Sequence, residues 1–199
     1  MLIYPKSLAG FTLIELMFAI AIVGILLAAG LPEASQWTQN TKIRTKSESI
    51  SNGLQLARGE AVRRNTRIQF MLTNSTPNVA TLPALAAGNT GSTTGVNWVV
   101  MNYQSTGVYT APDFVQGGGN EVTTSSAAIS STDATVVFNG LGRSDIVAAN
   151  VTIQVTNPAG GACVAASGPM RCLNVVVLPG GQIRMCDPSI ATAGDTRKC

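Results

Sequence analysis

The sequence predicts an α+β protein in which a long N-terminal helix packs on a β-rich C-terminal head. Two observations lead to this prediction: an apolar run near the start of the chain, and short segments of alternating apolar and polar residues over its later part. Of the 199 residues, 45% are hydrophobic and 12% are charged, whereas a typical soluble domain has roughly 25% charged residues. This balance excludes a disordered chain, because disorder needs few apolar residues and many charges.

Residues 11–31 form an apolar run that only Thr12 and Glu15 interrupt. As an α-helix the run would be about 32 Å long at roughly 1.5 Å per residue, which matches the thickness of a bilayer core. A buried globular helix is the alternative, but helices of that kind are usually shorter and less uniformly apolar. We therefore predict that the run is the transmembrane half of a longer helix.

The residues before this run have the features of a leader that is removed. They carry one positive charge, Lys6, and they end in two small residues, Ala9 and Gly10. An ordinary secretory signal has its small-residue cleavage site after the apolar stretch rather than before it. Cleavage after Gly10 would instead remove residues 1–10 and leave the membrane helix on the mature chain, which indicates a specialised export route.

Glu15 is the one acidic residue within the apolar run. A carboxylate inside a membrane segment costs a few kcal/mol and normally has a partner and a function. Cleavage after Gly10 would create a new α-amino group on Phe11, four residues before Glu15, so an ion pair within the chain is one alternative. The other is an ion pair with the amine of a neighbouring subunit, which would set the axial register during assembly.

The segment Gly10–Met17, with the sequence GFTLIELM, resembles the processing motif of type IV prepilins and type II secretion pseudopilins. The resemblance implies that a prepilin peptidase cuts after Gly10 and methylates the new N-terminal Phe11. It also implies that Glu15 is the family's assembly glutamate and that Pro32 is the proline that bends its long helix. The chain would then pass once through the inner membrane with its head in the periplasm, and other major and minor pilins or pseudopilins would be its partners in a filament.

Residues 32–66 are predicted to be the amphipathic half of the same helix. The apolar positions on one face recur at helical spacing and are Ile43, Ile50, Leu54, Ala57 and Ala61. We expect one helix from about residue 11 to residue 65 that bends near Pro32, because proline removes a backbone donor and crowds the preceding turn. With the resemblance above, this arrangement corresponds to the type IV pilin-like fold.

Residues 67–199 are predicted to form an antiparallel β head outside the membrane. Segments that alternate with period two, or that are short and rich in valine, are typical of strands and comprise residues 67–72, 97–103, 135–138, 151–155, 173–178 and 182–185. Pro179–Gly181 would close a hairpin between the last two. Residues 73–95 and 104–133 are rich in Gly, Ser, Thr and Asn, and we expect loops there with room for a short strand.

The four cysteines lie within the last 37 residues of the chain. They contain no C-x-x-C pair, which argues against a zinc site, and we expect no metal ion or other cofactor. An even number of cysteines in an exported domain favours disulfides. Of the three possible pairings we favour the sequential one, in which Cys163 is bonded to Cys172 and Cys186 is bonded to Cys199.

The composition argues against catalysis. The chain has no histidine, which removes histidine-based triads, imidazole metal sites and the usual general base. Asp133, Asp145 and Asp187 are scattered without paired-carboxylate spacing, and the glycines at positions 117–119 lack the lysine of a phosphate-binding loop. We therefore predict a structural protein rather than an enzyme.

Three further segments narrow the resemblance to the GspH/FimT group of minor pilins and pseudopilins. They are LARGEAVRRN at residues 56–65, FNGLG at residues 138–142 and the segment from Arg184 to Cys199. The resemblance implies a structural minor pilin that is built into a type IV pilus near its tip and supports pilus assembly. A GspH-like minor pseudopilin of a type II protein secretion system is the alternative that the sequence leaves open.

DNA uptake is a further activity that the resemblance implies. Some FimT-like minor pilins bind DNA through a C-terminal G-R-x-R motif, whose positions here are Gly181, Gln182, Ile183 and Arg184, so glutamine replaces the first arginine. Because alternate residues of a strand share a face, Gln182 and Arg184 would point the same way. The residues expected to contact double-stranded DNA, if Cys199 folds back beside Cys186, are Arg171, Gln182, Arg184, Arg197 and Lys198.

Overall fold

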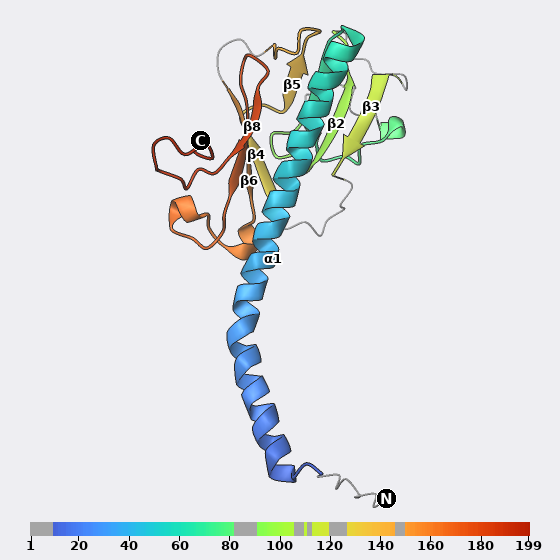
Figure 1. Ribbon diagram of the computed structural model, residues 1–199. Helices are drawn as coiled ribbons and strands as arrows, with labels where there is room; N and C mark the ends of the chain where they lie inside the picture. Colours follow the sequence, from blue (N-terminus) through green and yellow to red (C-terminus); the bar gives the residue numbers. More distant parts are fainter. Residues whose placement is uncertain (1–9, 82–90, 106–109, 111–112, 120–126, 146–149) are drawn as a thin grey trace, which may run out of the picture. The chain divides into compact units, whose positions relative to one another are not determined.

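The computed structural model describes residues 10–81, 91–105, 110, 113–119, 127–145 and 150–199, except for the side chains of residues 27–34 and 81. The chain divides into two compact units, Met1–Trp37 and Thr38–Cys199. Helix α1, Leu13–Arg64, is one element of 52 residues (Figure 1), which agrees with the helix predicted from about residue 11 to residue 65. Of the predicted leader at residues 1–10, only Gly10 belongs to the described part.

In the unit Met1–Trp37, the first turns of α1 present their apolar side chains to the surroundings. Every large hydrophobic side chain between Phe11 and Leu26 is between 53% and 86% exposed. Among the described residues, no helix is both long and apolar enough to cross a membrane. Pro32 lies within the helix, but its side chain is outside the described part, so the bend expected there stays a prediction.

The half of α1 that belongs to the second unit is amphipathic, as predicted. Its five predicted apolar positions are each 0% exposed, and they are Ile43, Ile50, Leu54, Ala57 and Ala61. Steps of three, four and seven residues put these side chains on one stripe of the helix. This buried stripe is the surface by which α1 joins the hydrophobic core of the head.

The described part of the head contains two antiparallel four-stranded sheets (Figure 1). In the first sheet the strand order is β3 (Phe114–Gly118), β2 (Asn97–Asn102), β1 (Ile68–Thr73) and β5 (Thr135–Phe138). In the second sheet it is β4 (Ala128–Ser131), β6 (Val151–Thr156), β7 (Leu173–Val177) and β8 (Ile183–Cys186). Short 3-10 helices occupy Val79–Thr81, Pro158–Gly160 and Val164–Ala166.

The six strands expected from the sequence are all present, each within one residue of its predicted limits. The predicted hairpin at Pro179–Gly181 joins β7 to β8. Strands β3 and β4 both lie inside the stretch 104–133, which was expected to be mainly loop. β3 contains two glycines and β4 contains two serines, so neither segment has the run of β-branched and aromatic residues that is typical of a strand. Both are edge strands, so they depend on pairing with β2 and β6, which the sequence does not reveal.

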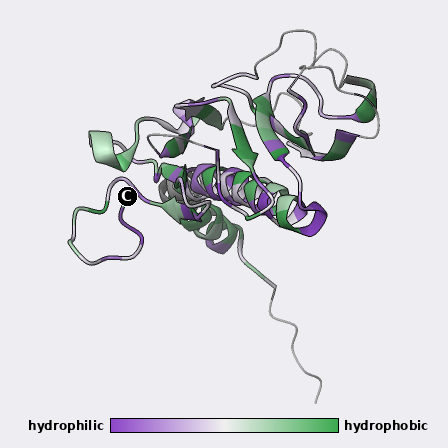
Figure 2. Ribbon diagram, turned by 90° about the horizontal axis from the view of Figure 1, so that it is seen from above, coloured by the Kyte–Doolittle hydropathy of each residue, from purple (hydrophilic) through white to green (hydrophobic). Residues whose placement is uncertain are grey.

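One hydrophobic cluster joins the buried stripe of α1 to residues of both sheets. In this cluster Phe70 and Phe138 come from the first sheet and Ile153 comes from the second, and none of the three is more than 1% exposed. Figure 2 shows hydrophobic residues along the strands that lie beside the helix. A smaller cluster on the opposite face of the first sheet contains Met71, Val99 and Met101, as expected when successive residues of a strand point to opposite faces.

Helix α1 approaches the first sheet closely at Trp98 of β2. The Trp98 ring stacks on Phe70 with a centroid separation of 5.9 Å, and its Nε1 donates to Ser49 Oγ at 3.1 Å. A Cβ atom at Gly53 of α1 would lie 2.9 Å from three atoms of the Trp98 ring. The helix can therefore pack directly on the indole only because position 53 has no side chain.

Two helical glycines should respond in opposite directions to replacement by alanine. Gly53→Ala would overlap the Trp98 ring and should destabilise the head, since overpacking costs about 1–3 kcal/mol. At Gly59, by contrast, nothing lies within 4 Å of an added Cβ. Gly59→Ala should therefore raise the free energy of unfolding by about 0.5–1 kcal/mol, because alanine is the better helix former. Urea unfolding of both variants measures the difference, and equal effects would contradict close packing at Gly53.

Candidate functional site

The first candidate region is the N-terminal end of α1, where Thr12 caps the helix. The Glu15 amide donates a hydrogen bond to Thr12 Oγ1 at 3.3 Å, and the Thr12 hydroxyl donates one to Glu15 Oε2 at 3.5 Å. This is a variant of the capping box, in which a threonine and a glutamate three residues later satisfy groups at a helix start. The arrangement holds the Glu15 carboxylate at the positive end of the helix dipole.

The ion pair predicted for Glu15 requires cleavage of the chain. Phe11 is joined to Gly10 by a peptide bond, so in the full chain it has no free α-amino group. Phe11 is 86% exposed and Gly10 is exposed as well, which leaves the bond between them accessible. The pairing of Glu15 with an amine therefore stays a prediction for the processed chain.

The second candidate region is the C-terminal segment that follows β8. Cys163 is bonded to Cys172, and Cys186 is bonded to Cys199. This is the sequential pairing that the sequence favoured. The second disulfide folds residues 187–199 back beside β8, where a short bridge adds main-chain contacts (Figure 1).

Two of the five residues expected to bind DNA lie as the strand pattern predicts. Gln182 and Arg184 are both exposed. They alternate with Ile183, which packs against the core, so they share the outward face of this hairpin strand. Arg184 Nη2 also donates to the main-chain oxygen of Cys199 at 3.3 Å, which places the folded-back segment against Arg184.

Arg197 and Lys198 are partly engaged within the C-terminal segment. Arg197 forms a two-pronged ion pair with Asp195, with the shorter contact at 2.8 Å. Hydrogen bonds from Arg197 lower the pKa of Asp195 to about 2, so this pair has no net charge at neutral pH. Lys198 Nζ donates to the main-chain oxygen of Ala191 at 3.0 Å and remains exposed.

Arg171 does not join the other candidate DNA-binding residues. Its amide donates to Asn40 Oδ1 of α1 at 2.8 Å. Arg184 is opposite Val176 in the β7–β8 pair, and Arg171 is five residues before Val176. At roughly 3.3 Å per residue, this separates Arg171 from Arg184 by about 16 Å along the strand.

A third region is the turn Asn139–Arg143, which contains most of the FNGLG segment. Asn139 Oδ1 accepts hydrogen bonds from the amides of Leu141 at 3.0 Å and Arg143 at 3.2 Å. Gly142 has φ +74°, a left-handed conformation that favours glycine. Its main-chain oxygen accepts a hydrogen bond from Arg58 Nε of α1 at 3.0 Å. The turn is thereby fastened to the end of the helix.

Ion pairs surround the same end of α1. Glu60 binds Arg63 at 2.6 Å and Arg64 at 2.7 Å. Hydrogen bonds from these two arginines lower the pKa of Glu60 to about 2. Arg67 binds Asp145 at 2.6 Å. Both carboxylates at this end of the head, Glu60 and Asp145, are therefore paired with arginines, and this end contains more arginines than carboxylates. Figure 2 shows the last turn of α1 as hydrophilic.

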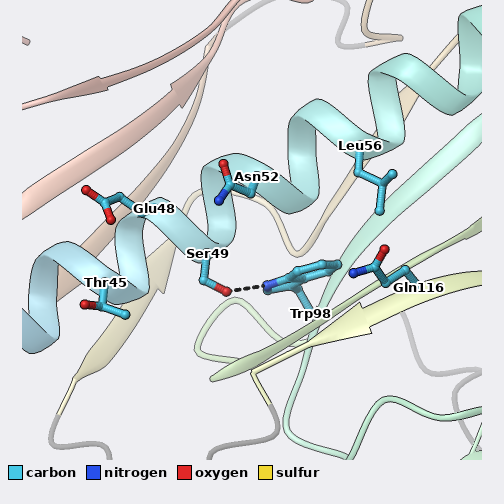
Figure 3. Close-up of a pocket in the computed structure, with 7 residues that line it drawn as sticks. All are labelled: Thr45, Glu48, Ser49, Asn52, Leu56, Trp98 and Gln116. Atoms are coloured by element: carbon cyan, nitrogen blue, oxygen red, sulfur yellow. Dashed lines mark hydrogen bonds between the residues drawn. The ribbon is translucent and has the colours of Figure 1, made fainter.

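A shallow pocket of about 480 Å³ lies between α1 and strands β2 and β3 (Figure 3). Its lining residues are Thr45, Glu48, Ser49, Asn52, Leu56, Trp98 and Gln116. Gly53 and Gly118 pack closely on the Trp98 ring, so the indole offers no open face for stacking. Glu48 is the one ionisable residue of the lining, and it is bound to Arg44 at 2.8 Å. The pocket thus lacks an acid–base pair.

The described residues include no group of three or more Cys, Asp or Glu side chains placed to hold a metal ion. All four cysteines are in disulfides. What the described surface does offer is an apolar helix face in residues 11–26 and clusters of arginine. Such surfaces are suited to insertion, assembly and the binding of anionic partners.

Two family matches extend over most of the chain. The family described as type II transport protein GspH matches residues 46–189, and the prokaryotic N-terminal methylation motif matches residues 6–31. The chain belongs to the GspH family. It is accordingly a minor pilin or pseudopilin of a type IV pilus or a type II secretion system, and its family is one of structural subunits rather than of enzymes.

The fold of this GspH-family chain is the type IV pilin fold. It resembles the type IV minor pilin FimU of Pseudomonas aeruginosa in two crystal forms, with TM-scores of 0.51 and 0.53 and 13% identity. The superpositions cover 75% and 79% of this chain and 97% of FimU. Two fimbrial proteins of P. aeruginosa are 40% identical over 57 residues, which is 29% of this chain and 36% of each relative. The chain thus spans about a third of the length of these relatives.

The sequence revealed some of these regions and missed others. The processing segment was recognised from GFTLIELM, and the methylation-motif match confirms that recognition. The pocket beside Trp98 was missed, because its lining comes from three elements that are distant in sequence. The surface at the end of α1 was also missed, although a leucine between two glycines in a polar turn, Leu141, was a visible signal.

Cys199→Ser should release residues 187–199 without unfolding the head. The second disulfide closes a segment with a sequence separation of 13 outside the main sheets, so its loss acts locally. We expect exchange of the Asp187 amide, which donates to Arg197 in the structure, to speed up roughly tenfold or more, while β6 keeps the protection of a core strand. Hydrogen exchange measured by mass spectrometry or NMR tests this.

Cys172→Ser is the matched control for this experiment. Cys172 is 2% exposed within the main cluster, so losing its disulfide should destabilise the whole head, by about 2–4 kcal/mol for a typical disulfide. A Cys199 variant that lost protection in β6 as strongly as the Cys172 variant would contradict a local role for the second disulfide.

Proposed function

We propose that this chain is a minor pilin of a type IV pilus, anchored in the inner membrane through residues 11–31 with its head in the periplasm. A prepilin peptidase would remove residues 1–10 and methylate Phe11. Other minor and major pilins would then assemble with the chain into the filament, near its tip. In this position the chain would support pilus assembly.

The observation that carries this proposal is the exposed apolar face of residues 11–26, combined with the methylation motif over residues 6–31. Apolar surface in water is unfavourable by about 25 cal/mol per Å². Side chains that are more than half exposed along four turns of helix therefore need lipid or neighbouring apolar helices around them. The membrane provides the first environment and the core of a filament provides the second.

Glu15 gives this apolar face its specificity. Its carboxylate lies in the first turn of α1, held by Thr12, and it is surrounded in sequence by exposed leucine, isoleucine and phenylalanine. In an apolar environment such a charge requires a cation. The α-amino group released at Phe11 by processing, on the same or a neighbouring subunit, would supply it and would fix the axial position of the subunit.

A minor pseudopilin of a type II secretion system is the alternative assembly. The observation in its favour is the match of residues 46–189 to the family described as type II transport protein GspH. Insertion, processing and the use of Glu15 would be the same in both assemblies. A deletion strain separates them: loss of twitching and of piliation supports the pilus, whereas loss of protein secretion with normal pili supports the secretion system.

Glu15→Ala should be processed and inserted like the wild-type chain but should fail to enter filaments. Removing the carboxylate makes the helix more apolar, which favours insertion, and it abolishes the ion pair that sets the register. Intact-mass measurement of the membrane-bound chain and immunodetection of the chain in sheared filaments provide the two readouts. Normal incorporation of the alanine variant would contradict the register argument.

Gly10→Leu is the control for the processing step. It leaves Glu15 unchanged but should block cleavage, so the chain should accumulate in the membrane at its full mass. The wild-type chain should begin at Phe11 and carry one added methyl group. A mature wild-type chain that begins elsewhere would remove the basis of the whole proposal.

DNA binding is a second candidate function, and the outward face shared by Gln182 and Arg184 favours it. Lys198 is exposed in the segment that folds back beside them. Arg197 is neutralised by Asp195, and Arg171 lies before the start of β7, five residues from the Val176 that pairs with Arg184. The candidate surface therefore offers two unneutralised cations, which would bind double-stranded DNA weakly and without sequence preference. Such binding would allow the filament to take part in DNA uptake.

Arg184→Ala should remove most of this DNA binding, and Gln182→Arg should strengthen it. Two phosphate contacts predict a slope of about −1.8 for log affinity against log salt, at roughly 0.9 per contact, and Gln182→Arg should steepen the slope by about one contact. Fluorescence anisotropy with a labelled duplex over a salt series measures this. Binding that does not respond to Arg184→Ala would show that this strand is not the DNA site.

A further inference from the structure

An exposed leucine stands at the end of α1 where the proposed function gives it no role. Leu141, a large apolar side chain, is 81% exposed. It lies on the turn Asn139–Arg143 after β5, next to the last turns of α1 and the β7–β8 hairpin (Figure 1). Leu141 is thus exposed even though the head around it is folded.

Hydrogen bonds hold the turn in one conformation, so the main chain at Leu141 has a fixed position on the surface. Asn139 Oδ1 accepts from the Leu141 and Arg143 amides, and the Gly142 amide donates to the Asn139 main-chain oxygen at 2.8 Å. From outside the turn, Arg58 Nε binds the Gly142 oxygen. Ser144 Oγ donates to the main-chain oxygens of residues 178 and 179 at 2.9 and 3.1 Å. A main chain that is already ordered loses little conformational entropy on binding, which favours a docking role.

Val62 of α1 extends the apolar surface next to this turn. It is 53% exposed, and a Cβ atom placed at Gly142 would be 3.1 Å from Val62 Cγ2. The helix and the turn are therefore in contact at this point. Leu141 and Val62 are thus two exposed apolar residues on adjoining elements, here called the apolar patch, and the described part of the head leaves both more than half exposed.

Arginines surround this patch and give it a strong positive charge. Residues 58–67 and 139–145 contain five arginines and two acidic residues, a net charge of +3, which equals the formal net charge of the whole chain. Glu60 and Asp145 are already bound to Arg63, Arg64 and Arg67. The C-terminal residues 182–199, in contrast, contain three basic and two acidic residues, a net charge of only +1. The end of α1 is thus more basic than the C-terminal segment.

We propose that Arg58, Val62, Arg63, Leu141 and Arg143 form a docking surface, the helix-end surface, for an acidic surface with an apolar pocket on another subunit of the same filament. The partner is a protein rather than a nucleic acid because apolar side chains anchor protein interfaces and arginine is enriched around them. The partner is acidic because both carboxylates of the helix-end surface are already bound to arginines and its remaining charge is positive. This inference rests on the proposed function, since it identifies the partner as a filament subunit.

Photocrosslinking from position 141 in the full chain tests the proposal. A photoreactive phenylalanine analogue replaces Leu141, filaments are sheared from illuminated cells, and the crosslinked peptides are identified by mass spectrometry. We expect one dominant product that joins position 141 to a pilin segment rich in Asp or Glu. The matched control is the same analogue at Val164, which is 42% exposed on a 3-10 helix of the head and should not give this product.

Charge substitutions at Arg143 test the acidic character of the partner. In the background of the crosslinker at position 141, Arg143→Glu should reduce the yield on the order of tenfold, the scale of a hot-spot residue. Arg143→Lys keeps the charge and should retain most of the yield. Arg143 is exposed, and it supports the turn through its main-chain amide and main-chain oxygen, which both variants keep, so both should fold, which protease resistance of the head verifies.

The outcomes separate this proposal from the proposed function. If the chain is present in filaments but position 141 gives no pilin product, the docking surface is wrong and the minor-pilin function stands. A crosslinked product with DNA, or with a basic segment, would show in the same way that the partner is not an acidic protein. A yield that Arg143→Glu leaves unchanged would show this too. If the chain never enters filaments, both the proposed function and the docking surface fail.

Discussion

The head depends on the buried stripe of α1 from Ile43 to Ala61, because this stripe shares one hydrophobic cluster with residues of both sheets. The two sheets have no strand in common in the described residues, so their relative position is set by contacts with the helix and with each other's side chains. Hydrogen bonds fasten the helix near both ends of the stripe. Asn157 Nδ2 donates to Gln39 Oε1 at 2.6 Å, and Arg58 Nε donates to Gly142 at the other end. Residues 38–64 of α1 and the two sheets therefore belong to one compact unit.

Sequence patterns predicted the helix and six strands because each of these elements has a local periodicity that its burial requires. The stripe of α1 follows helical spacing, and the strands alternate or consist of buried valines. Strands β3 and β4 could not be predicted in this way. Gly117 and Gly118 in β3 have no side chains to alternate, and their place in the sheet depends on the neighbouring strand and on the Trp98 ring.

The candidate sites likewise divide into those that a contiguous segment of the sequence reveals and those whose residues only the fold brings together. GFTLIELM is a contiguous segment, so the processing site was visible in the sequence, whereas DNA-binding residues were grouped only by their charge and by one expected disulfide. The disulfide formed, but Asp195 lies two residues from Arg197 and neutralises it, and the strand register separates Arg171 from Arg184. The helix-end surface shows the converse. Its arginines come from α1 and from a turn more than seventy residues later, and only folding reveals that they adjoin.

Both disulfides connect residues that are close in sequence, with separations of 9 and 13, and neither includes α1 or the first sheet. No disulfide is needed to bring the helix and the two sheets together, because their core consists of contacts between apolar side chains. The order of events in the cell is therefore not constrained by oxidation. We therefore expect the reduced chain to be able to reach the native topology, with oxidation then stabilising the core at Cys172 and securing the C-terminal segment at Cys199. A subunit waiting in the membrane for assembly would thus present a folded head from the start.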